Sequence, residues 1–150
     1  METDQQHSSS FDLTVHEEER RLPVGRERLV EISIRAFTAT GKQPAALALV
    51  VSSDAFISRL NLRYRGVEEP TDVLSFPAGD EGELGDIVIS LDAARRQAAA
   101  YGRSPEEEFI HLYVHGLLHL LGYNHGSRRA ARAMSRLSDS IIRGGAKEHS

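Results

Sequence analysis

The sequence predicts one α/β domain, a mixed four-stranded sheet with one antiparallel strand, packed by about five helices around a central helix. Two kinds of segment alternate along the chain: strand-like segments with alternating or continuous apolar residues, and segments of helical periodicity. The connection between Phe76 and Asp86 is too short for a crossover helix, so the two strands that it joins are expected to run antiparallel. A length of 150 residues suits a single hydrophobic core.

The first half of the chain predicts a tail and four elements. Residues 1–10 are polar and rich in Ser and Gln, which is typical of disorder, and the domain is expected to span 11–150. The predicted elements are a half-buried strand over Phe11–Val15, a helix over Val24–Thr40 ended by Gly41, a buried strand over Ala45–Val51, and a helix capped by Ser53 or Asp54 that runs to Gly66. The apolar positions assigned to the two helices are Leu29, Val30, Ile32, Ile34 and Phe37 in the first, and Ile57, Leu60, Leu62 and Tyr64 in the second.

The second half predicts two more strands and three more helices. These are a strand over Asp72–Phe76 ended by Pro77, a loop over Ala78–Gly85, a strand over Asp86–Ser90, a helix over Asp92–Ala100, a helix from Ser104 to Gly122, and an arginine-rich helix from Ser127 to Ile142. The helix after Ser104 is the best marked, because Ser104, Pro105 and Glu107 form a capping box with a first-turn proline. Apolar residues surround it, which predicts a buried, central position.

Composition narrows the function classes. The net charge of −4 excludes a globally basic nucleic-acid binder and leaves room for a local basic patch. The chain has no cysteine, so any metal site must use His, Asp or Glu. The polar start lacks a signal-peptide core, and no apolar run is long enough to span a membrane, so we expect a cytoplasmic protein without a membrane partner.

Three histidines in the run HGLLHLLGYNH predict a metal site. His115 and His119 lie four residues apart and therefore on one face of a helix. Gly122 can take the left-handed conformation that ends a helix, and the chain can then return His125 toward the pair. Three imidazoles with a fourth position open to water are typical of a catalytic zinc site. Zinc is the expected ion, although nickel or copper would accept the same ligands.

Two observations refine this hypothesis. His111 continues the row one turn earlier but lies roughly 12 Å of helix rise from His119, so both cannot bind one ion. A plainer interpretation is that these are buried histidines satisfied by hydrogen bonds. The spacing of the three histidines together with Gly122 nevertheless favours a metal site. In zinc proteases a glutamate general base follows the first histidine, and here that position is Gly116, which disfavours peptide hydrolysis.

Three motifs in order carry a family resemblance: LNLRYRGVEEPTDVLSFP (Leu60–Pro77), LGDIVIS (Leu84–Ser90) and HGLLHLLGYNH (His115–His125). On these motifs, from about Leu60 to Met134, the chain resembles the YbeY family of bacterial rRNA-maturation endoribonucleases. The resemblance implies a zincin-like fold with one zinc ion bound by the three histidines. It implies cleavage of single-stranded RNA in 16S rRNA 3′-end maturation and ribosome quality control, with rRNA and the ribosome or its small subunit as partners and no DNA.

The resemblance also assigns Arg65 to the functionally essential arginine of the family. A guanidinium can pair bidentately with a phosphate and offset charge that develops in the transition state, whereas by itself Arg65 would be interpreted as a solvated residue. Other motif residues have a structural interpretation, namely Thr71, Asp72, Ser75, Phe76 and Pro77. Asp86 fits either a partner that orients a ligand histidine or the start of a strand.

The chain departs from the family pattern at two places. Asn124 stands where the family usually has Asp, so no carboxylate precedes His125. Glu68 and Glu69 occupy positions where the family more often includes a basic residue, which weakens the local field for RNA.

Candidate RNA contacts are arginines. Arg128, Arg132 and Arg136 form a stripe on the last helix with Arg129 beside it, and Arg59, Arg63 and Arg65 lie near the first motif. The plainer interpretation of the stripe is a solvated helix face. Two rival functions remain, a metallopeptidase with a substitute base and a non-catalytic ribosome-assembly factor with a structural zinc.

Overall fold

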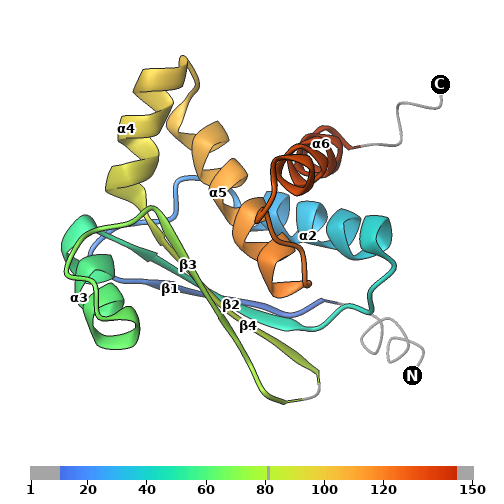
Figure 1. Ribbon diagram of the computed structural model, residues 1–150, viewed down its shortest axis with the longest axis horizontal. Helices are drawn as coiled ribbons and strands as arrows, with labels where there is room; N and C mark the ends of the chain where they lie inside the picture. The colour runs from blue at the N-terminus through green and yellow to red at the C-terminus, as the bar shows by residue number, and fades with distance from the viewer. Residues whose placement is uncertain (1–10, 81, 145–150) are drawn as a thin grey trace.

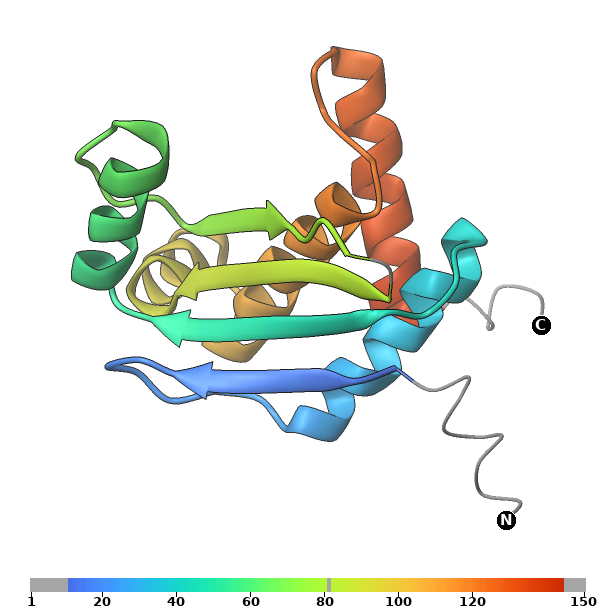
Figure 2. The ribbon, with the colours of Figure 1, turned by 90° about the horizontal axis from the view of Figure 1, so that it is seen from below.

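The fold is built on a four-stranded mixed sheet (Figures 1 and 2). The computed structural model describes residues 11–80 and 82–144, so the predicted tail at 1–10 lies outside the described residues. The strands are β1 (Leu13–Glu17), β2 (Ala46–Ser52), β3 (Val73–Pro77) and β4 (Glu83–Ser90), in the order β1-β2-β4-β3. β1, β2 and β4 are parallel and β3 is antiparallel to β4, which confirms the mixed sheet predicted from the short connection.

Helices cover both faces of this sheet. They are α2 (Arg26–Thr40), α3 (Asp54–Arg65), α4 (Leu91–Tyr101), α5 (Pro105–Leu120) and α6 (Arg128–Arg143). α5 and α2 share the main core with alternate residues of β2 and β4, and α6 packs outside against α5 and α2. α3 packs on the opposite face, where Ile57 meets Leu74 and Val88. Within the part of the chain that the structure describes, the predicted α/β class with five helices is confirmed.

Several predicted boundaries shift. β1 begins and ends two residues later than predicted, and β4 begins at Glu83, inside the predicted Ala78–Gly85 loop. Pro77 is the last residue of β3 rather than the residue that stops it. β3 lies at the edge of the sheet, where a proline without an N–H is tolerated because one side of the strand needs no partner.

The apolar faces assigned to two helices were partly wrong. Ile34, Leu62 and Tyr64 have exposed fractions of 45%, 46% and 60%. In α3 the buried residues are Ile57 and Asn61, whereas Leu62 and Tyr64 in its last turn stay largely in solvent. Asn61 donates through Nδ2 to the carbonyl of Glu69 at 2.9 Å, which ties the following loop to the helix.

α5 begins as the sequence predicts. Ser104 accepts from the backbone N–H of Glu107, and the Glu107 side chain accepts from the backbone N–H of Ser104, at 3.1 and 2.8 Å. Nine of its residues are buried, among them Phe109, Tyr113 and Leu117, so the helix forms part of the core. Among the residues whose structure is described, no helix is long and apolar enough to cross a membrane.

Candidate metal centre

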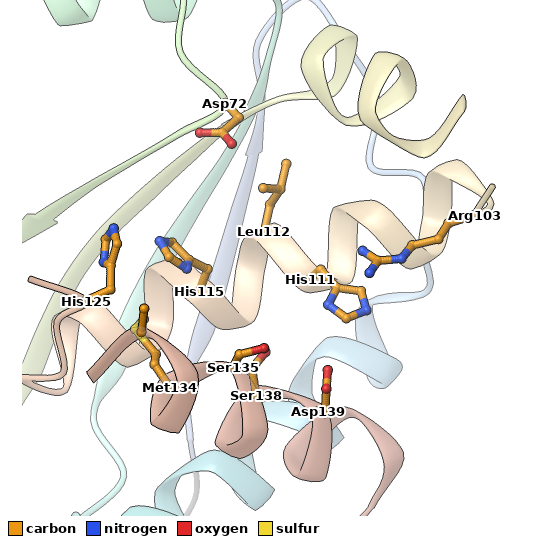
Figure 3. A pocket seen from close by; sticks show the side chains of 11 residues that line it. Asp72, Arg103, His111, Leu112, His115, His125, Met134, Ser135, Ser138 and Asp139 are labelled. Carbon is orange, nitrogen blue, oxygen red and sulfur yellow. The ribbon is translucent and has the colours of Figure 1, made fainter. Parts of the chain in front are cut away.

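Three histidines converge at the end of α5. His115 and His119 project from the helix and His125 from the loop that follows it, and one ligand-type nitrogen of each lies within 4.8 Å of the others. Their ring centroids are 4.7, 5.2 and 5.0 Å apart. Figure 3 shows the imidazoles of His115 and His125 side by side above α5. Three imidazoles gathered at one point without a carboxylate are a donor set that suits a borderline transition metal such as zinc.

The turn after α5 returns the third histidine. The helix ends at Leu120, and Gly122 has a φ of 102°, the positive region that glycine enters without a Cβ penalty. The N–H of Gly122 donates to the His119 carbonyl at 3.0 Å and that of Tyr123 to the Leu118 carbonyl at 2.9 Å, the pair of bonds that defines a Schellman motif. The predicted role of Gly122 in reversing the chain is confirmed.

Asn124 shapes the loop that carries His125. Its side-chain Oδ1 accepts from the backbone N–H of Gly126 at 3.0 Å, an Asx-type turn that spans His125. An aspartate would accept the same bond, so the departure from the family pattern at Asn124 keeps the fold of the loop and removes only a negative charge.

The surroundings keep the helical pair of imidazoles neutral. Burial lowers the pKa of His115, and the neighbouring His119 and His125 lower it further, while Asp72 acts in the opposite direction. Burial and His125 likewise lower the pKa of His119. A metal binds the neutral form of imidazole, so these shifts favour binding near neutral pH.

Gly116 brings α5 close to the sheet directly beside His115. A Cβ at this position would lie 3.0 Å from Ile87 Cγ2, 3.1 Å from Ser75 Oγ and 3.3 Å from Val73 Cγ2. Ser75 Oγ also donates to the Gly116 carbonyl at 3.2 Å. The position where a zinc protease has its glutamate is therefore a packed contact between helix and sheet, with no room for a longer side chain.

An open pocket brings Arg65 to the three histidines. This pocket, of about 750 Å³, has Tyr64, Arg65, Phe76, all three histidines and Asp72 among its lining residues. Arg65 is exposed at the end of α3. The structure thus places the predicted arginine and the predicted ligands on one cavity, although they lie about fifty residues apart in the sequence.

A second pocket, of about 390 Å³, adjoins the histidines on the α6 side, and Asp72, His115 and His125 line both pockets (Figure 3). The sequence interpretation gave Asp72 a structural role only and missed its place at both pockets. Its carboxylate accepts from the backbone N–H of Val73 at 2.8 Å and from Gln97 Nε2 at 3.2 Å, and it also faces the site. The signal in the sequence was an acidic residue at the start of a motif strand.

His111 lies in the second pocket and is not one of the three converging histidines. The helix-rise argument that separated it from the metal group agrees with this placement. Burial and the nearby Arg103 lower its pKa. Arg103 itself pairs with the nearly buried carboxylate of Glu108 at 2.7 Å.

The structure does not support a role for Asp86 beside the histidines. Asp86 is an exposed residue within β4, three positions after the strand begins. Its neighbour Ile87 faces α5, and alternation along the strand directs Asp86 to the other face of the sheet. Both earlier interpretations, the partner of a ligand histidine and the start of the strand, were therefore wrong.

The remaining charged candidates are exposed. Arg128, Arg132 and Arg136 are exposed on α6, and the residues of that helix that line the second pocket are instead Ala131, Met134, Ser135, Ser138 and Asp139. Arg59 lies 3.4 Å from the carboxylate of Glu19. Glu68 and Glu69 are exposed in the loop after α3.

A mixed α/β domain that presents three histidines in an open pocket has the architecture of a metal-dependent hydrolase. The family model described as endoribonuclease YbeY matches residues 13–144. The chain therefore belongs to the YbeY family of endoribonucleases.

Individual relatives support this family assignment. An endoribonuclease YbeY from Pelotomaculum thermopropionicum is 48% identical over 109 residues, covering 67% of this chain and 72% of the relative. One from Moorella thermoacetica is 37% identical, covering 89% of this chain and 97% of the relative. The solution structure of a Thermotoga maritima protein has a TM-score of 0.58 at 22% identity, covering 91% and 93% of the two chains, and supports the fold alone.

Proposed function

We propose that this protein is a zinc-dependent, single-strand-specific endoribonuclease that acts in 16S rRNA 3′-end maturation and in ribosome quality control. The observation that carries the proposal is the convergence of three imidazoles on a pocket whose wall also holds Arg65. Single-stranded rRNA is its substrate and the ribosome or its small subunit its partner. Because these are its targets, the cytoplasm is its place of action.

His115, His119 and His125 would hold the zinc ion in a zincin-like arrangement on α5, the central helix of the domain. When bound, zinc supplies Lewis acidity to a phosphodiester oxygen and lowers the pKa of water. The protein contributes neutral imidazoles, because burial lowers the pKa of His115 and His119. His125 is exposed, so the group opens to solvent as a catalytic site requires, whereas a structural zinc site is closed by a fourth protein ligand.

Arg65 would hold the scissile phosphate. Its exposed guanidinium at the pocket wall can donate two parallel N–H bonds to the phosphate oxygens, and it offsets the charge that develops on them. Asp72 would accept a proton from the attacking water or 2′-hydroxyl. The hydrogen bonds from Val73 and Gln97 fix this carboxylate where it faces both pockets.

Gly116 argues against peptide hydrolysis by the H-E-x-x-H mechanism. Zinc proteases of that type take their general base from the glutamate directly after the first histidine, and the tight contact of Gly116 with β3 and β4 excludes a glutamate at this position. With a net charge of −4, affinity for RNA must come from local arginines, and binding is expected to weaken steeply with salt.

The test compares His119→Ala with His111→Ala. Loss of one of three ligands is expected to reduce bound zinc and single-stranded RNA cleavage by more than about 100-fold, beyond the effect of losing an outer partner. His111→Ala removes a histidine from the same helix row and is expected to keep both properties. Metal analysis and cleavage of matched single- and double-stranded RNAs measure this. Cleavage by His119→Ala after thorough chelation would contradict the proposal.

A further inference from the structure

An exposed aromatic pair stands on the pocket wall next to Arg65. Tyr64 has an exposed fraction of 60%, and its ring centroid lies 5.2 Å from that of Phe76 at an interplanar angle of 60°. Both residues line the pocket that contains the three histidines. The Arg63 guanidinium lies 5.9 Å from the Tyr64 ring centroid. A large ring left in solvent beside a cationic group and a candidate phosphate site is a feature that the mechanism above does not use.

The surrounding structure holds this ring in place. Tyr64 lies in the last turn of α3, which Gly66 closes with a left-handed φ of 73° and an N–H bond to the Leu62 carbonyl at 3.0 Å. Phe76 is half-buried in β3 and packs on the apolar cluster of Ile57, Leu74 and Val88. Tyr64 therefore projects from an anchored helix end and its ring packs on Phe76 of the neighbouring strand, so little side-chain entropy is lost when a ligand stacks on it.

We propose that Tyr64, supported by Phe76, forms a stacking subsite for one unpaired nucleobase of the RNA, adjacent to the phosphate that Arg65 binds. This inference rests on the proposed function and deepens it. Aromatic side chains stack on bases of any sequence because every base has a π-face, and Arg63 adds a positive charge beside the ring. Bases within a duplex are already stacked and paired, so the subsite favours single-stranded RNA.

The experiment replaces the ring and the base in turn. Tyr64→Leu removes the aromatic face, and Tyr64→Phe keeps it. Tyr101→Leu is the matched control, because Tyr101 has an exposed fraction of 65%, has Arg103 5.5 Å from its ring centroid, and lies outside the lining of both histidine pockets. Each variant of the zinc-loaded full chain is titrated in excess over a short labelled RNA, and the same RNA is tested with an abasic site at each position.

We expect Tyr64→Leu to raise the half-saturating protein concentration about tenfold, while the maximal cleavage rate stays close to that of the wild type. Tyr64→Phe and Tyr101→Leu should match the wild type. For the wild type, one abasic position should produce a similar tenfold loss, and that loss should disappear in Tyr64→Leu because ring and base act as one contact.

Two results would overturn the subsite. The first is a half-saturating protein concentration of Tyr64→Leu equal to that of the wild type. The second is an abasic scan whose profile is the same for the wild type and for Tyr64→Leu. In either case cleavage by the wild type would leave the proposed function standing. Failure of the wild-type protein to cleave any of these RNAs would instead contradict the proposed function, and the subsite with it.

Discussion

The two ends of the histidine row on α5 have different surroundings. His111, His115 and His119 repeat every four residues along one face of the helix. At the far end, the turn at Gly122 adds His125 to the pair formed by His115 and His119. At the near end, His111 faces a pocket with Arg103, which pairs with Glu108.

This difference shows that the spacing of histidines along a helix is not sufficient to form the candidate metal centre. The helix offers the same imidazole at each turn, and what selects two of them is the chain reversal that supplies a third. At the other end His111 shares its pocket with Arg103 and is not one of the converging histidines. The residues that follow the histidines also differ, since Leu112 and Leu120 follow two of them and Gly116 follows His115.

The largest effect on stability is expected at Gly116. Gly116→Ala would place a Cβ 3.0 Å from Ile87 Cγ2 and 3.1 Å from Ser75 Oγ, so these packed side chains would have to give way by a few tenths of an ångström. Such overpacking is expected to lower the free energy of unfolding by about 1–3 kcal/mol and to displace His115 from its partners. Urea unfolding gives the first quantity, and the zinc dissociation constant gives the second.

Gly79→Ala is the control for this substitution. A Cβ at Gly79 meets nothing within 4 Å, and its φ is not in the positive range. The free energy of unfolding should change by no more than about 0.5 kcal/mol. Equal stability of the two variants would show that the contact beneath His115 is not tight.

A smaller and more specific effect is expected at the turn. Gly122→Ala and Gly102→Ala each force a side chain into a positive φ, 102° and 72° respectively, and in both a Cβ meets nothing within 4 Å. Each is expected to lower the free energy of unfolding by about 1–2 kcal/mol through backbone strain. Zinc affinity should fall only in Gly122→Ala, because only that turn returns His125. Calorimetric titration with zinc separates the pair, and equal affinities would show that the turn does not select the ligands.

These contrasts also explain what the sequence could predict. The candidate ligands were predictable because helix geometry and one glycine fix them locally, and the antiparallel strand followed from a connection too short for a crossover. The exposure of Tyr64 and the position of Asp72 at both pockets were not, because they depend on how the folded sheet places α3 and β3 relative to α5. For Asp86 the face of the strand decides, and the face follows from a register that is set by long-range packing.

The smallest expected effect concerns the pH dependence of the metal-free protein. Burial, followed by Arg103, lowers the pKa of His111 below its ordinary value of 6.5, and Glu108, Asp139 and Glu107 oppose this only partly. Between the lowered pKa and 6.5 the unfolded chain therefore binds more protons at this residue than the folded chain does. Its contribution to the free energy of unfolding is complete above that interval and is lost as the pH falls through it.

His115 and His119 titrate with the same sign, so the metal-free protein should lose stability as the pH is lowered below about 6.5. His111→Gln removes one of these groups and should make the decline shallower, without changing zinc affinity at neutral pH. Urea unfolding of both proteins at a series of pH values measures the slope. An equal or steeper decline in His111→Gln would mean that the near end of the row does not share the lowered pKa of the far end, and the two ends would then differ in protonation as well as in the turn.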